Sequence, residues 1–364
     1  MSVLNDIDYL TFTPGFFEKI WGGQKLRSEL GMPISPDKPI GEAWLVADHA
    51  AHESIVDEGP LAGQTLRTLL EADAPALLGS RARLTVHGRF PLLLKILDAH
   101  DVLSVQVHPD DEAAARLGEP DVGKTEMWRV LQADPGSELI CGLAPDTTPD
   151  QLRAAISEAS VEQLMTHIPA EPGTAVFVAA GTVHAIGGGI LLAEIQQNSD
   201  ITYRLYDYDR RDASGQPREL HIEKALSVIR FGSAHRGAAR PLTIRQGPNQ
   251  RTLLAACRYF AAESITVNGL FTRETRGESF HILLPETDGL LLRGKGARLS
   301  LVRGRAVLLP GDRVSFEIEG EGNLLDYYVP NLHVDVIAPL NREGFASDAI
   351  ARLGGDPATS DVRP

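Results

Sequence analysis

The segment RFPLLLKILDAHDVLSVQVHP, residues 89–109, constrains the fold more than any other part of the chain. It is apolar on both faces for much of its length, which is typical of strands buried in a β-sandwich or barrel. The polar residues near Ala99 to Asp101 divide it into two strands. The segment therefore predicts a sandwich or barrel with both of these strands in its core.

The remaining sequence also favours a mainly β fold. Its 34 Gly and 23 Pro are scattered along the chain, which fits many short strands joined by tight turns better than a helical bundle. Helical patterns are few and short. They cover residues 63–79 with Thr65 as N-cap and Gly79 as stop, 112–118 after Asp110 and Asp111, 148–167 with Pro149 in the first turn, and 221–232 ending at Gly232.

Short β runs recur from Leu253 to about Pro339 and predict a second β-sandwich or barrel, after a connector near residue 235. We therefore predict an N-terminal domain, 1–235, that carries helices and the active site, and a C-terminal β domain, 236–340. A mostly irregular tail, 341–364, completes the chain. His281 and His333 stand alone in the second domain, which predicts a structural or interface role for it.

Charge and hydropathy exclude several classes of function. The formal net charge of −14 disfavours nucleic acid as a partner, although a local group of cations can still bind a small anion. No apolar stretch approaches the roughly 20 residues needed to cross a bilayer, and MSVLNDIDYL lacks the features of a secretion signal. We expect a cytoplasmic protein without a membrane partner, in which Cys141 and Cys257 are reduced, partly buried thiols.

The string LSVQVHPDD has the spacing of a metal site. Gln106 and His108 lie two residues apart in an alternating run, so both side chains leave the same face of a strand. An amide oxygen and an imidazole nitrogen suit a divalent ion such as zinc, and a carboxylate and a second imidazole would complete the shell. Glu126 in GKTEMW and His184 in GTVHAIGGG are the candidates. Each of the four alone has an ordinary structural interpretation, and only the set favours a metal.

Three further residues are candidates for catalysis. Lys124 lies two residues before Glu126, so the amine either faces the same cavity or forms a surface salt bridge. Arg204, in TYRLYDYDR, either acts on a substrate or pairs with Asp207 or Asp209. Glu194 is a partner for an imidazole, a proton shuttle, or a buried acid paired with a neighbouring strand.

The strings FEKIWGG, GEAW, FPLLLKILDA, LSVQVHPDD, GKTEMW, GTVHAIGGG and AEIQQNSDITYRLYDYDR together resemble the type I mannose-6-phosphate isomerase family in its shorter bacterial form. The resemblance covers roughly the first 230 residues, lacks the helical insertion of longer members, and is loose in the C-terminal domain. It implies a bicupin, two β-sandwich or jelly-roll barrels with short helices on the first. It also implies one zinc ion per chain, held by Gln106, His108, Glu126 and His184, with Lys124 and Arg204 as active-site cations.

The resemblance implies interconversion of mannose 6-phosphate and fructose 6-phosphate through an enediol or enediolate. The base is left open between Glu194, Lys124 and a metal-bound water, and the phosphate would bind basic and backbone N–H groups of the first domain. One alternative is an iron-dependent cupin oxygenase, which the QxH pattern in place of HxH disfavours. Another is a non-catalytic sugar-binding or regulatory bicupin, which the complete set of ligands and cations disfavours. The expected partner is a small sugar phosphate, and both a monomer and a dimer stay open.

Overall fold

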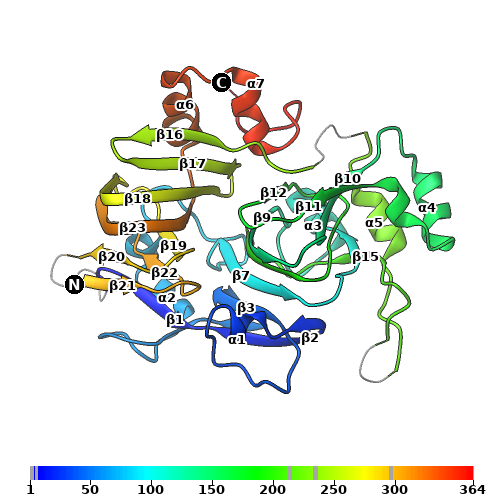
Figure 1. The fold of residues 1–364 in the computed structure, drawn as a ribbon, viewed down its shortest axis with the longest axis horizontal. Coiled ribbons are helices and arrows are strands. Elements are labelled where there is room, and N and C mark those ends of the chain that lie inside the picture. The colour runs from blue at the N-terminus through cyan, green and yellow to red at the C-terminus, as the bar shows by residue number, and fades with distance from the viewer. Residues whose placement is uncertain (1–3, 5–6, 212–214, 233–236, 295–297, 364) are drawn as a thin grey trace. The chain divides into compact units, whose positions relative to one another are not determined.

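The computed structural model describes residue 4 and residues 7–211, 215–232, 237–294 and 298–363. Strands dominate these residues and the helices are short (Figure 1), which confirms the predicted mainly β fold. No helix among them is long and apolar enough to span a membrane. The arrangement as two cupin barrels stays a prediction.

Contacts divide the chain into two compact units. Over its described residues, unit 1 comprises 1–15, 44–94 and 240–364, and unit 2 comprises 16–43 and 95–239. The predicted contiguous domain 1–235 differs from this division because early segments join late ones. Leu10 pairs with Leu308 across two strands, and Gly311 N donates to Leu77 O at 2.9 Å. Residue 235 itself lies outside the described residues.

Unit 1 is built on one antiparallel sheet. Over its described residues the sheet has ten strands, in the order β16-β17-β18-β23-β19-β22-β1-β6, with β20 paired to β23 and β21 paired to β20. The bounds are β1 Leu10–Thr13, β6 Ile55–Val56, β16 Leu242–Gln246, β17 Asn249–Ala256, β18 Ala261–Glu274, β19 His281–Pro285, β20 Leu290–Arg293, β21 Arg298–Leu301, β22 Val307–Leu309 and β23 Ser315–Tyr328. A hairpin of β4 Asp48–His49 and β5 His52–Glu53 and the helix α2 Leu66–Leu78 belong to the same unit.

The tail was predicted to be mostly irregular, and this prediction is wrong for its first part. Within 341–364 the structure has the end of α6 Ala338–Arg342, then α7 Ser347–Ala351 and η3 Arg352–Gly354, while η2 Leu332–Ile337 lies before it, in the last part of the predicted β domain. Leu340, Ile350 and Leu353 are at most 1% exposed and join a core cluster with Leu242 and Leu253 of the sheet. Burial of these apolar side chains, which the polar composition of the tail concealed, orders the segment.

Two further antiparallel sheets have most of their described residues in unit 2. One has the order β11-β10-β13-β8-β15 and the other the order β12-β9-β14-β7-β2-β3. The bounds are β2 Gly15–Gly23, β3 Ile40–Val46, β7 Leu92–Ala99, β8 Val105–Val107, β9 Glu126–Ala133, β10 Glu138–Leu143, β11 Met165–Pro169, β12 Ala175–Val178, β13 His184–Ile186, β14 Ile190–Gln197 and β15 Tyr203–Tyr206. The helices are α1 Lys25–Ser28, α3 Asp111–Leu117, α4 Pro149–Ser157, η1 Val161–Leu164 and α5 Ile222–Val228.

Local signals place most of the helix ends. Thr65 caps α2 by accepting from Thr68 N, and Gly118 ends α3 in the left-handed region at φ 70°. Two predicted helices are too long. The one at 148–167 stops at Ser157, because Ala159 takes φ +53° and the chain enters β11. The one at 221–232 ends at Val228, where Ile229 turns to the extended conformation.

Alternation along the strands of unit 2 separates two apolar clusters. Trp128, Val130, Ile186, Ile190 and Leu192 belong to one core, which takes residues from both sheets. In the five-stranded sheet, the side chains on the opposite face form a second core, which packs against the helices. Polar residues in phase with the first core therefore point into the space that the two sheets share.

Candidate metal centre

Gln106, His184 and Arg204 occupy one row across three neighbouring strands. Gln106 pairs with His184 of β13 on one side and with Arg204 of β15 on the other. Val105 and Val107, which flank Gln106, belong to the core beneath the helices, so Gln106 points to the opposite face. The predicted amide, imidazole and guanidinium thus come from adjacent positions of one sheet.

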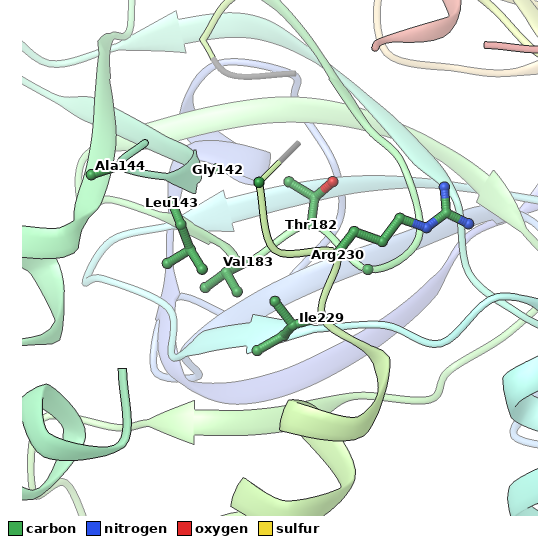
Figure 2. A pocket seen from close by; sticks show the side chains of 9 residues that line it. Gly142, Leu143, Ala144, Thr182, Val183, Ile229 and Arg230 are labelled. Atoms are coloured by element: carbon green, nitrogen blue, oxygen red, sulfur yellow. The ribbon is translucent and has the colours of Figure 1, made fainter. Parts of the chain in front are cut away.

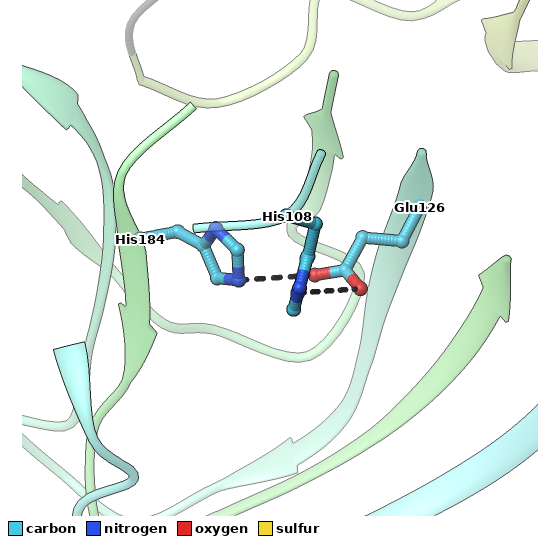
Figure 3. Close-up of side chains that lie close together, drawn as sticks. All are labelled: His108, Glu126 and His184. Carbon is cyan, nitrogen blue, oxygen red and sulfur yellow. Dashed lines mark ion pairs between the residues drawn. The ribbon is translucent and has the colours of Figure 1, made fainter. Parts of the chain in front are cut away.

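His108, Glu126 and His184 converge in the interior of unit 2 (Figure 3). The Nε2 atom of His108 lies 3.6 Å from Glu126 Oε2, and His184 Nε2 lies 3.4 Å from Glu126 Oε1. All three side chains are at most 1% exposed. Within the described residues this is the one group of at least three His, Cys, Asp or Glu side chains with metal-binding geometry.

The polar atoms of this group are buried and largely unsatisfied. His108 Nε2 and both carboxylate oxygens of Glu126 have no hydrogen-bond partner among the described residues, although Glu126 Oε2 forms an ion pair with Lys124 Nζ at 3.0 Å. Such atoms cost free energy unless a ligand satisfies them. A metal ion would satisfy all three.

Both imidazoles are held in the neutral form that binds metals. Burial lowers the pKa of His184 to about 4, and burial and Lys124 lower the pKa of His108 well below its ordinary value. His184 Nδ1 lies 2.8 Å from the carbonyl oxygen of Thr182, which only accepts hydrogen bonds, so Nδ1 carries the proton. His184 Nε2 is therefore the bare nitrogen that faces Glu126.

Gln106 borders the same group. Its Nε2 lies 3.3 Å from His184 Nε2, and its Oε1 accepts from Ser104 Oγ at 3.3 Å. Amide nitrogen and oxygen exchange places by a half-turn of the side chain, which would bring the oxygen to face the imidazole. The structure thus brings together all four residues that the sequence predicted as ligands.

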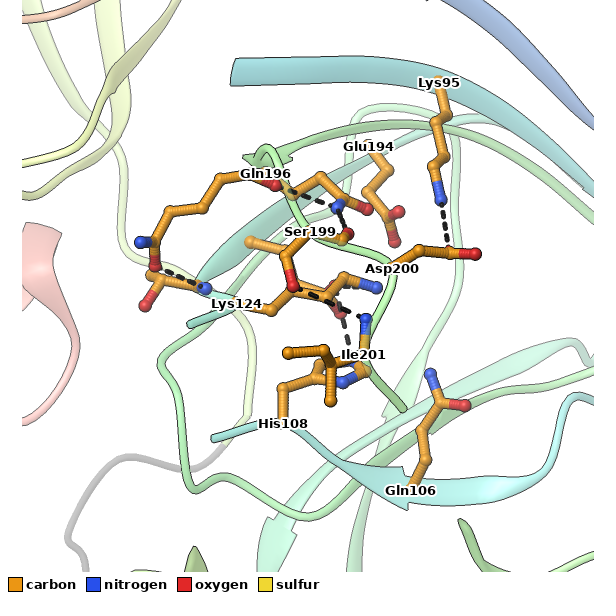
Figure 4. Close-up of polar contacts among 12 residues, drawn as sticks. Lys95, Gln106, His108, Lys124, Glu194, Gln196, Ser199, Asp200 and Ile201 are labelled. Atoms are coloured by element: carbon orange, nitrogen blue, oxygen red, sulfur yellow. Dashed lines mark hydrogen bonds and ion pairs between the residues drawn. The ribbon is translucent and has the colours of Figure 1, made fainter. Parts of the chain in front are cut away.

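The turn after β14 holds the segment between Lys124 and Glu126 in place (Figure 4). Gln197 Oε1 accepts from Thr125 N at 3.0 Å, and Gln197 Nε2 donates to Asp111 Oδ1 at 2.9 Å. Gln196 Nε2 donates to the carbonyl oxygens of Gln197 and Ser199. The Gln197 amide thus fixes the backbone of Thr125, between Lys124 and Glu126, and the Gln196 amide stabilises the turn that follows β14.

A cavity of about 310 Å³ opens beside this group, within unit 2. Lys124, Glu194 and Arg204, the three predicted catalytic residues, all line it together with Gln106. Its other lining residues are Lys19, Trp21, Glu42, Lys95, Leu97, Leu103, Ser104, Ile186, Asp200, Thr202 and Arg218. The volume and the polar lining suit a small polar ligand.

Lys95 is a buried cation of the cavity that sequence analysis missed. Its Nζ lies 3.5 Å from Glu42 Oε2 and 3.5 Å from Asp200 Oδ1. Burial opposes its charge, but Glu42 and Asp200 raise its pKa above the ordinary value. The signal was present, because a single lysine within the apolar run PLLLKILDA must be paired if the strand is buried.

Glu194 is buried and oriented. Its Oε2 accepts from the indole Nε1 of Trp128 at 3.0 Å. Burial, and then Glu126, raise the pKa of Glu194 to about 6. A carboxylate in this environment exchanges protons near neutral pH.

Arg204 does not form either of the ion pairs considered from the sequence. Asp207 pairs instead with Arg210 and Arg218, at 2.6 Å and 2.7 Å. Arg204 Nη1 donates to the carbonyl oxygen of Glu219 at 2.9 Å, and its buried Nε has no hydrogen-bond partner among the described residues. This guanidinium is thus available to a ligand.

A second, smaller cavity of about 20 Å³ lies nearby in unit 2 (Figure 2). Residues including Gly142, Gly181, Thr182, Val183 and Arg230 line it. The space fits one water molecule, since a site for water needs ~10–15 Å³. None of the candidate metal ligands lines this cavity.

In unit 1, His281 is held by Asp326, with His281 Nδ1 2.8 Å from Asp326 Oδ1. This imidazole belongs to a paired, buried network rather than to a metal-type group among the described residues. This network supports the predicted structural role of the C-terminal β domain.

Comparisons with known proteins agree with the family resemblance. Residues 10–126 match the model of the type I phosphomannose isomerase catalytic domain. Mannose-6-phosphate isomerase ManA of Bacillus subtilis is 38% identical over 318 residues, which cover 85% of this chain and 96% of that protein. Mannose-6-phosphate isomerase of Streptococcus mutans is 36% identical over 304 residues, with 84% and 93% covered. A crystal structure of the mannose 6-phosphate isomerase from Bacillus subtilis matches with a TM-score of 0.80 at 34% identity, over 88% of this chain and 99% of that one.

Proposed function

This chain belongs to the type I phosphomannose isomerase family, and we propose that it interconverts mannose 6-phosphate and fructose 6-phosphate. Relatives that this chain matches over most of their length are named mannose-6-phosphate isomerase. The observation that carries the proposal is the convergence of His108, Glu126 and His184 beside a cavity that holds buried acids and cations.

The proposed metal is one zinc ion, with Gln106, His108, Glu126 and His184 as its ligands. Zinc bonds of ~2.0–2.2 Å in a tetrahedral shell place neighbouring ligand atoms roughly 3.4 Å apart. His184 Nε2 lies 3.4 Å from Glu126 Oε1, which is close to that value, and His108 Nε2 lies 3.6 Å from the other oxygen, Oε2. Two neutral imidazoles, a carboxylate and an amide are also a donor set that zinc accepts.

The reaction moves a proton between two neighbouring carbons while negative charge develops on oxygen. When bound, zinc supplies Lewis-acid stabilisation of that oxygen. Lys124, fixed by Glu126 at 3.0 Å, adds a positive charge at the same end of the cavity. Arg204 is the second cation proposed to act on the substrate.

Glu194 is the residue we favour as the proton carrier. It lines the cavity, and Trp128 holds one of its oxygens. Lys124 is a poorer candidate because its amine is already engaged by Glu126. A metal-bound water remains the competing base, and replacement of Glu194 by Gln separates the two, since only a carboxylate base requires the acid at this position.

The two alternatives make different demands. An iron oxygenase would consume oxygen, whereas the isomerase neither consumes nor releases another reactant. A non-catalytic sugar-binding protein would bind the sugar phosphate without turnover. Both are tested with the same purified protein.

The experiment is a coupled assay of mannose 6-phosphate conversion, with and without a chelator, and with zinc restored. We expect wild type to be active only with metal, His108→Ala to lose zinc and activity, and Arg204→Ala to lose activity while it retains zinc. Absence of fructose 6-phosphate from the zinc-restored wild type would contradict the isomerase proposal. Full zinc occupancy in His108→Ala would contradict the ligand assignment.

A further inference from the structure

The lysines that line the large cavity are already paired with acids. Within the described residues, Lys19 Nζ lies 3.0 Å from Glu42, Lys95 Nζ lies 3.5 Å from Glu42 and from Asp200, and Lys124 Nζ lies 3.0 Å from Glu126. Glu194 adds another acid to the same part of the lining. This part of the cavity therefore has little positive charge left for an anionic ligand.

The arginines of the cavity are in the opposite situation. Arg210 and Arg218 both pair with Asp207, and Arg210 also lies 3.8 Å from Asp101, whereas Arg204 has no ion pair with a carboxylate among the described residues. Arg210 also donates to the carbonyl oxygen of Val102, and it does not line the cavity. Three guanidinium groups beside these two carboxylates leave an excess of positive charge at this end.

Arg204 and Arg218 present this excess charge to the cavity, which both of them line. Burial, and then the like charge of Arg218, lower the pKa of Arg204 below its ordinary value, although Asp207 and Glu219 act in the opposite direction. The buried Nε of Arg204 also lacks a hydrogen-bond partner among the described residues. An anion between these two side chains would supply both the charge and the acceptor.

The arginine end lies one strand beyond the candidate metal ligand Gln106. His184, Gln106 and Arg204 are paired in register across three strands. Neighbouring strands are ~4.8 Å apart, so the row from His184 to Arg204 spans roughly 10 Å. A six-carbon sugar with its carbonyl end at the His108, Glu126 and His184 group would extend its other end toward the arginines.

We infer that Arg218, held by Asp207 and next to Arg204, forms the subsite that recognises the phosphate group of the substrate. The inference rests on the proposed function, because it assumes that the cavity takes a sugar phosphate. A phosphate monoester carries a charge of about −1.5 to −2 near pH 7, which matches the uncompensated arginine charge. Guanidinium groups also bind phosphate oxygens through paired donors.

Asp207 acts as a positioning residue in this subsite. Arg218 Nε donates to Asp207 Oδ2 at 2.7 Å, and Arg218 Nη2 donates to Asp207 Oδ1. This two-point contact fixes the plane of the guanidinium and leaves Nη1 as the remaining donor group. A fixed arginine loses less conformational entropy on binding than a free one.

The test compares Arg218→Gln, Arg218→Lys and Asp207→Asn with the wild type, all as full chains loaded with zinc. The matched control is Arg116→Gln, which removes one exposed arginine of unit 2 that does not line the cavity. The measurements are kcat and KM for mannose 6-phosphate, the inhibition constant of inorganic phosphate, and zinc content. Circular dichroism establishes that each variant is folded.

For Arg218→Gln we expect KM and the inhibition constant of phosphate to rise ~10- to 100-fold, because a charged hydrogen bond is lost, with a much smaller change in kcat. Arg218→Lys should recover part of this loss, Asp207→Asn should show a smaller increase, and Arg116→Gln should behave as wild type. Zinc content should not change in any variant.

Wild-type values of KM and of the phosphate inhibition constant in folded Arg218→Gln would overturn the subsite and leave the isomerase function standing. A fall in kcat alone would overturn it as well. If wild type itself shows no turnover, the proposed function fails separately. In that case calorimetry measures the affinity of wild type and of Arg218→Gln for inorganic phosphate. Equal affinities would contradict the proposed subsite.

Discussion

The indole Nε1 of Trp128 donates a hydrogen bond to the carboxylate of Glu194 at 3.0 Å, and both side chains are buried. The two residues are directly paired on the neighbouring strands β9 and β14. The same indole also packs edge-on against His184, with ring centroids 5.4 Å apart. Trp128 therefore joins the proposed proton carrier to a proposed metal ligand.

Replacement of Trp128 by Phe tests this link. Phe keeps most of the apolar contact but removes the donor, so Glu194 Oε2 loses its partner and its orientation. We expect kcat to fall roughly tenfold, which corresponds to ~1.4 kcal/mol, with little change in KM. Steady-state kinetics on the zinc-loaded protein provide the measurement. Trp44→Phe, at a buried position in unit 1, is the control. An equal kcat in Trp128→Phe and Trp44→Phe would contradict the positioning role of Trp128.

Metal binding should stabilise the folded protein. The buried oxygens of Glu126 and Nε2 of His108 lack hydrogen-bond partners among the described residues, so an ion that binds them favours the native state. At a free zinc concentration 1,000 times the dissociation constant, the gain in the free energy of unfolding is about 4 kcal/mol. Thermal unfolding of chelated protein, before and after zinc addition, measures this gain.

His108→Ala should lose this zinc-dependent gain. The matched control is His167→Ala, which removes a half-exposed imidazole of unit 2 that is outside the metal-type group. A similar zinc-dependent rise in the unfolding temperature of all three proteins would mean that zinc binds elsewhere.

The two cysteines should not react in the native state. Cys141 and Cys257 form no disulfide and are buried, more fully than the sequence analysis predicted. Burial raises the pKa of each thiol to about 12, and the reactive thiolate is therefore scarce at pH 8. We expect a thiol reagent to modify neither residue in folded protein and both in denaturant. Rapid modification of one thiol per native chain would contradict this expectation.

The group of His108, Glu126 and His184, with Gln106 beside it, could be predicted from the sequence because two of these residues are close in the chain and all four lie in specific motifs. Gln106 and His108 share a strand face by alternation alone, His184 ends a strand-like run, and Glu126 lies in the motif GKTEMW. Asp207 shows the limit of this reasoning. The sequence offered it as a partner for Arg204, but it pairs with Arg218, eleven residues along the chain, whose approach depends on a turn that local patterns do not specify.

The division of the chain into units was beyond sequence reasoning for a related reason. Leu10 and Leu308 pair across almost the whole length of the chain, and no local pattern records such a pairing. The buried positions in the tail were also hidden, because Ile350 and Leu353 stand among polar residues. Periodicity in the sequence locates helices and strands, whereas the pairing of strands that lie far apart in the chain has to be observed in the structure.

A buried ionic network in unit 1 should make stability depend on pH. Glu263 is fully buried and accepts hydrogen bonds from Arg251 at 2.8 Å, Arg273 at 3.0 Å and Tyr328 at 2.6 Å. Burial alone would raise the pKa of this carboxyl, but Arg251 and Arg273 more than reverse the effect and hold its pKa well below the ordinary value. The ionised form is therefore the one that stabilises the fold.

The sign of the pH dependence follows from the lowered pKa. In the unfolded chain the pKa of Glu is ~4.3, so the contribution of Glu263 is fully present above that pH and is lost as the pH falls below it. Glu263→Gln leaves Arg251 without its acid and Arg273 with Asp326 alone, and should lower the free energy of unfolding by about 3–5 kcal/mol at pH 7. Urea denaturation at pH 7, 5, 4 and 3 should show the gap to wild type narrowing at the acid end. The control is Glu274→Gln, at an exposed position on the same strand. If the difference in the free energy of unfolding between wild type and Glu263→Gln stays constant down to pH 3, the ionisation of Glu263 is not what stabilises unit 1.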